Sequence, residues 1–195
     1  MSGNSGSRSG AMGQSERTRQ GYSTTAKSMH WLIALLLIAQ FVVAILMPDI
    51  GPKTVPGTLI NLHLSLGVLI LVLMAARFIY RQLYPVALEM TDSPAWERWI
   101  ARATHRAFYF ILLIAPFLGW ASASAHRFPI DVFGIVSLPA IAAPKASWAL
   151  TAGDVHGYLM WMLLGLMALH AAAALYHYFF RHDGVLQRML PAGRK

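Results

Sequence analysis

Four long apolar stretches constrain the fold of this chain more than any other feature of its sequence. Each contains roughly 20 mainly apolar residues, the length that an α-helix needs to cross a hydrocarbon layer about 30 Å thick. Inside that layer every backbone N–H and C=O group must find its partner within the protein, which favours helices. We therefore predict an all-α fold, a transmembrane four-helix bundle over residues 26–180. The predicted spans are approximately residues 26–47, 59–80, 105–125 and 155–180.

The segments outside the predicted spans differ in character. The second connection contains charged residues and prolines, and Ser93 is a suitable N-cap for a separate short helix that begins at Pro94. The third connection, residues 126–153, is apolar but broken by prolines and glycines, which predicts a folded interfacial loop. Residues 1–25 are rich in Ser, Gly and Arg and lack the apolar core of a signal peptide, so we predict a flexible tail. A second tail is predicted over residues 181–195.

The charge pattern predicts how the bundle is oriented. Of the 195 residues, 56% are hydrophobic and 12% are charged, and the net charge is +8. A soluble domain usually carries about twice that charged fraction. The basic residues cluster at the ends of the apolar stretches, thirteen on one side of the predicted membrane and three on the other. Short loops rich in Lys and Arg stay in the cytoplasm, so both termini are predicted to be cytoplasmic, and nucleic-acid binding is not indicated.

The absence of cysteine limits the metal chemistry of the chain. It excludes disulfides, thiolate-bound iron–sulfur clusters and covalent attachment of a c-type haem. Histidine is then the main residue type that can bind a transition metal, apart from methionine.

Two histidines share one face of the last predicted span. His156 and His170 are 14 residues apart, which nearly completes four helical turns and separates them by roughly 21 Å along the axis. They therefore lie near opposite sides of the hydrocarbon layer. An ionisable, metal-binding side chain in that setting indicates a functional site. Their spacing predicts two stacked metal centres.

The direction of each span sorts four histidines into two pairs by depth. His30 lies in the first turns of the first span, on the cytoplasmic side, and His63 lies in the first turns of the second span, which enters from the outer side. We predict that His30 meets His170 on the inner side and that His63 meets His156 on the outer side. His177, seven residues beyond His170, is a reserve ligand or a hydrogen-bond partner.

A haem suits such pairs of histidines. Iron held by two axial histidines is saturated, so it exchanges electrons instead of binding oxygen. A porphyrin is flat and apolar and fits between the helices of a bundle, especially beside small residues. The small residues near the candidates are Gly67, Gly157 and Ala171–Ala174. Haem propionates are anionic and require basic partners. Arg77 and Arg106 are the inner candidates, with Arg81 nearby, and Lys53 and Arg127 are the outer candidates.

Other interpretations stay open on these observations. A membrane histidine often makes only a hydrogen bond between helices. A zinc or copper site is disfavoured, because two histidines per depth leave the coordination shell incomplete and the predicted spans contain no Asp, Glu or Cys. His105 is expected to be an interfacial anchor or a contact for a cofactor carboxylate. His126 and His182 are expected at the membrane surface.

The motifs around these histidines resemble those of the bacterial cytochrome b561 family. They are HWLIALLLI around His30, NLHLSLGVLILVLMAARFIYR around His63, HRAFYFILLIAPFLGW, FPIDVFGIVSLP and the closing HAAAALYHYFFRHDGVLQRMLP. The match covers approximately residues 25–192. It is specific because the spacing of His156 and His170 occurs together with the closing motif. Members of this family are four-span proteins of the bacterial inner membrane with two b-type haems.

The resemblance implies a ligand set and a class of activity. It implies that His30, His63, His156 and His170 are the axial ligands of two non-covalent haems b. It also implies electron exchange with quinone dissolved in the membrane lipid. Some members are expected to oxidise superoxide on the outer face and to pass the electron to ubiquinone. Basic residues on that face would attract the anion. They are Lys53, Arg127 and Lys145.

One position departs from the family pattern. Many relatives have two adjacent histidines near the end of the last span, where this chain has His177 followed by Tyr178. A role for the second histidine is therefore not implied.

Two other functions stay open. The first alternative is a cytochrome b subunit that anchors a larger dehydrogenase or hydrogenase. The second is a non-redox membrane protein that uses its histidines for helix packing or proton relay.

Overall fold

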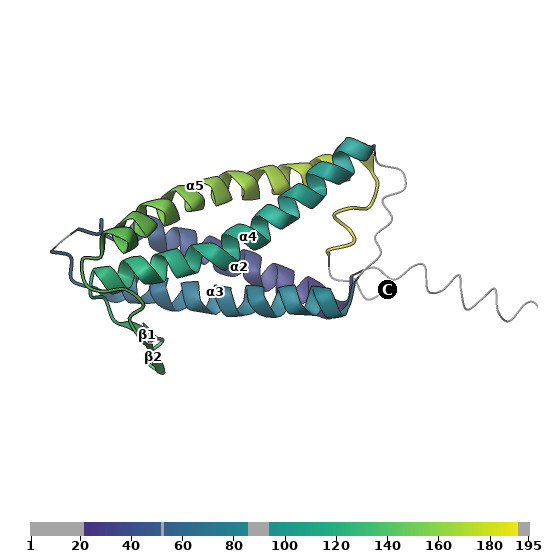
Figure 1. The fold of residues 1–195 in the computed structure, drawn as a ribbon. Helices are drawn as coiled ribbons and strands as arrows, with labels where there is room; N and C mark the ends of the chain where they lie inside the picture. Colours follow the sequence, from purple (N-terminus) through teal and green to yellow (C-terminus); the bar gives the residue numbers. More distant parts are fainter. Residues whose placement is uncertain (1–21, 52, 86–93, 191–195) are drawn as a thin grey trace, which may run out of the picture.

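Four long helices form most of the structure, a computed structural model that describes residues 22–51, 53–85 and 94–190 (Figure 1). The helices are α2 (Thr24–Leu46), α3 (Thr58–Leu83), α4 (Ala95–Ala125) and α5 (Ser147–Tyr176), and a π-helix, η1 (His177–Arg181), continues α5. Two short strands, β1 (Ile130–Val132) and β2 (Val136–Leu138), pair antiparallel between α4 and α5. All four long helices are long and apolar enough to cross a membrane. Most of the predicted tail over residues 1–25, and the end of the tail over 181–195, lie outside the described residues.

The predicted helix boundaries were wrong at two places. The separate short helix predicted at Pro94 is the start of α4, which runs without a break for 31 residues from Ala95. No glycine or proline interrupts residues 95–115, so nothing ends the helix before the expected start of the third span. The fourth helix begins at Ser147, eight residues before the predicted start near Val155. Ala149 and Ala152 bury their side chains there, so packing extends the helix into the predicted loop.

The remainder of the predicted third loop contains the β-hairpin. Phe133 and Gly134 both have positive φ angles, 51° and 71°, and make the turn between β1 and β2. Ser65 of α3 is buried below the hairpin, where its hydroxyl donates to the Asp131 carbonyl and accepts from the Phe133 amide. The hairpin is therefore fixed to α3 through one serine close to His63.

The helices form two layers. α2 packs along α3, α4 packs along α5, and α3 also contacts α4 and β1. Within the described part of the chain, α2 and α5 are not a closely packed pair. We call the end that holds β1 and β2 the hairpin end, and the opposite end, where the described chain starts at Tyr22 and stops at Leu190, the terminal end (Figure 1).

An apolar core lies midway along the bundle. Its buried members come from all four helices: Ile33, Leu37, Ile70, Met74, Ile111, Leu112, Ala115 and Leu163. Leu163 is 0% exposed and lies seven residues from both His156 and His170. Many large apolar side chains on the outer faces of the helices are exposed, as expected for surfaces that contact lipid.

Small residues bring α4 and α5 close together near the hairpin end. The buried members of this contact are Ala121, Ala125, Ala149 and Ala152. Gly153 continues the contact, because a Cβ atom at this position would clash with the Ser122 side chain. Membrane helices have little hydrophobic drive to associate, so small residues that allow close backbone approach are a main source of packing energy.

Gly153→Val is therefore expected to destabilise the bundle by about 1–3 kcal/mol, the usual cost of overpacking. Thermal unfolding of the purified protein in detergent micelles measures this change. Gly165→Val is the matched control, because a Cβ at Gly165 meets nothing within 4 Å. Equal unfolding temperatures for the two variants would contradict the importance of the α4–α5 contact.

Candidate functional site

At the terminal end, a histidine of α2 faces a histidine of α5. The ring centroids of His30 and His170 are 6.4 Å apart, and the rings are inclined by 70°. Two residues of α4 also contact His170: His105, at 5.7 Å between centroids, and Phe108, at 5.4 Å. Trp31 places its ring edge against His30 at 5.5 Å. We call His30 and His170 the terminal-end pair.

At the hairpin end, a histidine of α3 faces a histidine of α5. The ring centroids of His63 and His156 are 6.3 Å apart, and the rings are inclined by 79°. Both rings line a mainly apolar cleft to which all four long helices and β1 contribute. Gln40, Gly67 and Gly119 also line it. We call His63 and His156 the hairpin-end pair.

The ring of His156 is held in one orientation by α4. Its Nδ1–H donates to the Ala115 carbonyl at 2.8 Å. Because a carbonyl oxygen can only accept, the proton lies on Nδ1, and Nε2 keeps its lone pair for a metal. A Cβ at Gly119 would lie 3.3 Å from two atoms of this ring, so the glycine leaves the room that the imidazole occupies. Sequence reasoning missed Ala115 and Gly119, although Pro116 and Gly119 in the middle of a span were a usable signal.

The ring of His63 has different surroundings. The Gln40 Nε2 amide of α2 donates to the His63 backbone carbonyl at 3.0 Å. His63 Nδ1 and Gln40 Oε1 are both buried without a hydrogen-bond partner in the structure. Gly67, predicted to make room beside the ligand, faces Gln40, since its Cβ would lie 3.6 Å from that amide nitrogen. A Cβ at Gly157 would meet nothing within 4 Å.

Two arginines of α3 lie near the terminal-end pair. Arg77 is within electrostatic reach of His30, and its Nη1 donates to the Ala26 carbonyl at 2.6 Å. Arg81 places its guanidinium 5.0 Å from the centroid of the Tyr22 ring, while its Nη1 is buried without a hydrogen-bond partner. Arg106, the second residue predicted to contact a propionate, is exposed. Arg81 therefore has a buried donor without a partner, whereas Arg106 is exposed.

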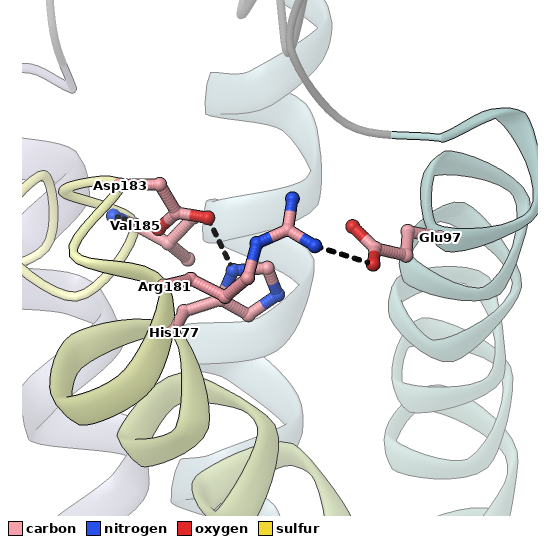
Figure 2. Close-up of polar contacts among 5 residues, drawn as sticks. All are labelled: Glu97, His177, Arg181, Asp183 and Val185. Carbon is pink, nitrogen blue, oxygen red and sulfur yellow. Dashed lines mark hydrogen bonds and ion pairs between the residues drawn. The ribbon is translucent and has the colours of Figure 1, made fainter.

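The end of α5 makes a polar cluster with the segment that follows it (Figure 2). His177 Nδ1–H donates to the Asp183 carboxylate at 2.5 Å, and Arg181 pairs with Glu97 of α4 at 3.1 Å. Partial burial raises the pKa of Asp183, but hydrogen bonds from His177 and the Val185 amide outweigh it and hold that pKa below its usual value. His177 is thus a hydrogen-bond partner of Asp183 in this structure.

The segment after η1 turns back across the terminal end. His182 has a positive φ of 50° and reverses the chain. Trp31 Nε1–H then donates to the Met189 carbonyl at 2.8 Å, and Lys27 Nζ donates to the Leu190 carbonyl at 3.0 Å. The segment is therefore tied to the first turns of α2, beside the terminal-end pair.

Each end of the bundle offers one pair of histidines, which suits a metal centre with two protein ligands. Within the described ranges, no three His, Cys, Asp or Glu side chains gather as they would around a single zinc or copper ion. With metal–imidazole bonds of about 2.0 Å on both sides of one ion, opposed rings have centroids roughly 6 Å apart. The observed 6.4 Å and 6.3 Å fit that arrangement.

These features define a class: a four-helix membrane protein with one opposed histidine pair towards each end of the bundle. Comparison with known proteins identifies the family within this class. The chain belongs to the prokaryotic cytochrome b561 family, whose model matches residues 21–192. This result confirms the family resemblance and the four-helix membrane fold predicted from the sequence. Membership implies that the protein is a membrane cytochrome that binds haem b.

Three similar proteins come from two bacteria. "Cytochrome b561 homolog 2" of Escherichia coli (strain K12) is 29% identical over 178 residues, which cover 89% of this chain and 93% of that protein. "Probable superoxide oxidase CybB" of Yersinia pestis is 28% identical over 173 residues, covering 89% and 97%. "Cytochrome b561 homolog 1" of Escherichia coli (strain K12) is 29% identical over 174 residues, covering 87% and 97%.

Proposed function

We propose that this chain binds two haems b and transfers electrons between a donor at the hairpin end and the membrane quinone pool. The observation that carries the proposal is the pair of facing imidazoles at each end, with centroids 6.4 Å and 6.3 Å apart. His30 and His170 would hold one haem, and His63 and His156 would hold the other. Each haem iron would supply one-electron chemistry, while the chain supplies ligation, spacing and electrostatic tuning.

The shape of the bundle supports a flat group at each pair. The terminal-end pair joins α2 to α5, two helices that do not pack closely within the described residues. The hairpin-end pair lines a cleft whose other walls are almost wholly apolar. At both places a porphyrin would lie between helices and beside mainly apolar side chains.

The terminal end also provides groups that suit haem propionates. Arg81 Nη1 is buried and lacks a partner, although a buried guanidinium donor normally has one. Arg77, one turn earlier on the same face of α3, lies within electrostatic reach of His30. We infer that these two arginines hold the propionates of the terminal-end haem through charge-assisted hydrogen bonds.

The charge asymmetry supports an orientation in the bacterial inner membrane. In the sequence, thirteen Lys and Arg residues come before the first span, around the second connection or after the last span, and three lie in the other two connections. By the positive-inside rule, the terminal end faces the cytoplasm and the hairpin end faces outward. The helical rise between His156 and His170 then separates the two centres by roughly 21 Å along the membrane normal. Electron transfer between them would respond to the membrane potential.

We propose superoxide as the donor, in line with the name of the Yersinia pestis relative. Oxidation of two superoxide anions releases two O₂ molecules and two electrons. Reduction of one quinone to quinol takes up two electrons and two protons, so the reaction balances. The three basic residues on the hairpin side, Lys53, Arg127 and Lys145, are exposed and would attract the anion.

The ionic-strength dependence of reduction tests this proposal. The purified protein is mixed with a continuous source of superoxide, and haem reduction is followed optically while salt is raised from about 0.01 M to about 0.15 M. The Debye length falls from about 30 Å to about 8 Å over this range. We expect the rate to fall roughly tenfold, as for a steered encounter.

A neutral one-electron reductant is the control, and its rate should not depend on salt. A salt-independent rate with superoxide would contradict electrostatic steering. No haem reduction by superoxide at any salt concentration would contradict superoxide as the donor, and failure of added quinone to reoxidise the protein would contradict the link to the quinone pool.

A further inference from the structure

Gln40 is an isolated polar residue in the apolar part of α2. Between Trp31 and Pro48 every other residue is apolar. A polar side chain within a membrane span is costly and normally faces the interior of the bundle, where it has a function. Gln40 does face inward, because it lines the cleft that holds His63 and His156.

The amide of Gln40 is only half satisfied. Its Nε2 donates to the His63 backbone carbonyl at 3.0 Å, which ties α2 to α3 at the level of the hairpin-end pair. Its Oε1 is buried and accepts no hydrogen bond in the structure. Leaving a buried acceptor without a partner costs free energy. The same free energy becomes available if a donor reaches it.

An unpartnered donor belongs to the same residue that Gln40 already contacts. His63 Nδ1 is buried and has no hydrogen-bond partner in the structure. If Nε2 of His63 binds iron, Nδ1 must carry the proton, and a metal-bound histidine almost always donates that proton to an acceptor. His156 has such an acceptor in the Ala115 carbonyl, at 2.8 Å. The hairpin-end pair therefore has one ligand with an acceptor and one ligand without.

We propose that Gln40 is the positioning residue of this pair: its Oε1 accepts the hydrogen bond from His63 Nδ1–H while its Nε2 holds the His63 carbonyl. This inference rests on the proposed haem ligation by His63. The Gln40 amide is already bound to the backbone of His63 through its Nε2. One side chain from α2 would then fix both the helix position and the ring orientation of a ligand on α3.

The consequence is an asymmetry between the two haems. A hydrogen bond at Nδ1 makes the imidazole a stronger donor to iron, which favours the ferric state and lowers the midpoint potential. For His156 the acceptor is a backbone carbonyl, which no substitution removes. For His63 it is a side chain, so one residue on α2 sets the potential of the hairpin-end haem and leaves the other haem unchanged.

The test compares midpoint potentials and ferric electron paramagnetic resonance spectra of the full-length haem-loaded protein. Gln40→Met keeps the length of the side chain and removes both hydrogen-bonding groups. We expect the potential of one haem to rise and its spectrum to change, with the other haem unaffected. A tenfold loss of preference for the ferric state corresponds to about 59 mV for a one-electron couple. Gln40→Glu keeps an acceptor oxygen at the same reach and should restore most of the wild-type spectrum.

Ala39→Met is the matched control, because Ala39 is adjacent, exposed on the lipid side of α2 and should change neither haem. Gln40→Leu provides a second apolar variant if the methionine variant folds poorly. Unchanged potentials and spectra in a di-haem Gln40→Met or Gln40→Leu protein would overturn the inference, and so would equal shifts of both haems. A wild-type protein without two haems would instead overturn the proposed function on which the inference rests.

Discussion

Replacing His63 or His156 with alanine is expected to remove one and the same haem, so that each variant retains about half of the wild-type haem content. Both side chains face the same point at the hairpin end, with ring centroids 6.3 Å apart. A haem that loses one of its two axial ligands keeps a single iron–imidazole bond and its apolar contacts, so we expect it to be lost during purification in detergent. The haem that survives in both variants should show the same spectrum.

His30→Ala and His170→Ala should remove the other haem. Quantification of extracted haem per chain, together with redox difference spectra, identifies which haem remains in each variant. His177→Ala is the control, because His177 donates to Asp183 and does not face either pair. If His30→Ala and His63→Ala removed the same haem, the assignment of pairs to the two ends would be wrong.

Gly119→Val is expected to remove the hairpin-end haem almost as completely as a ligand substitution. A single Cβ at this position would already lie 3.3 Å from His156 Nδ1 and Cε1, and valine adds two branching methyl groups. The ring cannot move away easily, because its Nδ1–H is bound to the Ala115 carbonyl on the same helix as Gly119. The imidazole would rotate or the hydrogen bond would break, and either change misdirects Nε2.

The matched control for this variant is Gly157→Val, which adds the same atoms next to His156 on α5 but towards open space. We expect Gly157→Val to keep both haems. The readouts are haem content per chain and the spectrum of the remaining haem. A Gly119→Val protein with two normally liganded haems would show that the close approach of α4 to His156 is not needed.

The helix directions and the depth of each histidine could be predicted from the sequence. A rise of 1.5 Å per residue and alternating span direction suffice to put His30 level with His170 and His63 level with His156. The structure places both pairs of rings within 6.4 Å between centroids. Such depth arguments tolerate uncertain span boundaries, because an error of two or three residues shifts a side chain by less than one helical turn.

The lateral contacts of the site could not be predicted in the same way. Which residue of α4 touches His156 depends on how far that helix rotates and bends near Pro116, and neither quantity is encoded in hydropathy. The role of Gln40 depends on the neighbour that α2 meets on α3, which is set by packing. For the same reason hydropathy and depth do not distinguish Arg81 from Arg106, since both are basic and lie at a similar predicted depth.

The connecting segments were the hardest part to predict. The hairpin of β1 and β2 has only three residues in each strand and is held by Ser65 and by a turn at Phe133 and Gly134. So short a sheet has no useful periodicity, and its stability comes from contact with α3. The early start of α5 likewise results from packing of alanines against α4, which a propensity argument does not include.

The most direct test of two paired-histidine haem centres is the haem content of the purified full-length protein. The chain is purified in mild detergent, and the extracted non-covalent haem is measured against protein concentration by quantitative amino-acid analysis. We expect two haems b per chain, both low-spin in the ferric state because each iron has two imidazole ligands. A content of one haem per chain, or a preparation without haem absorption, would contradict the assignment of a haem to each pair.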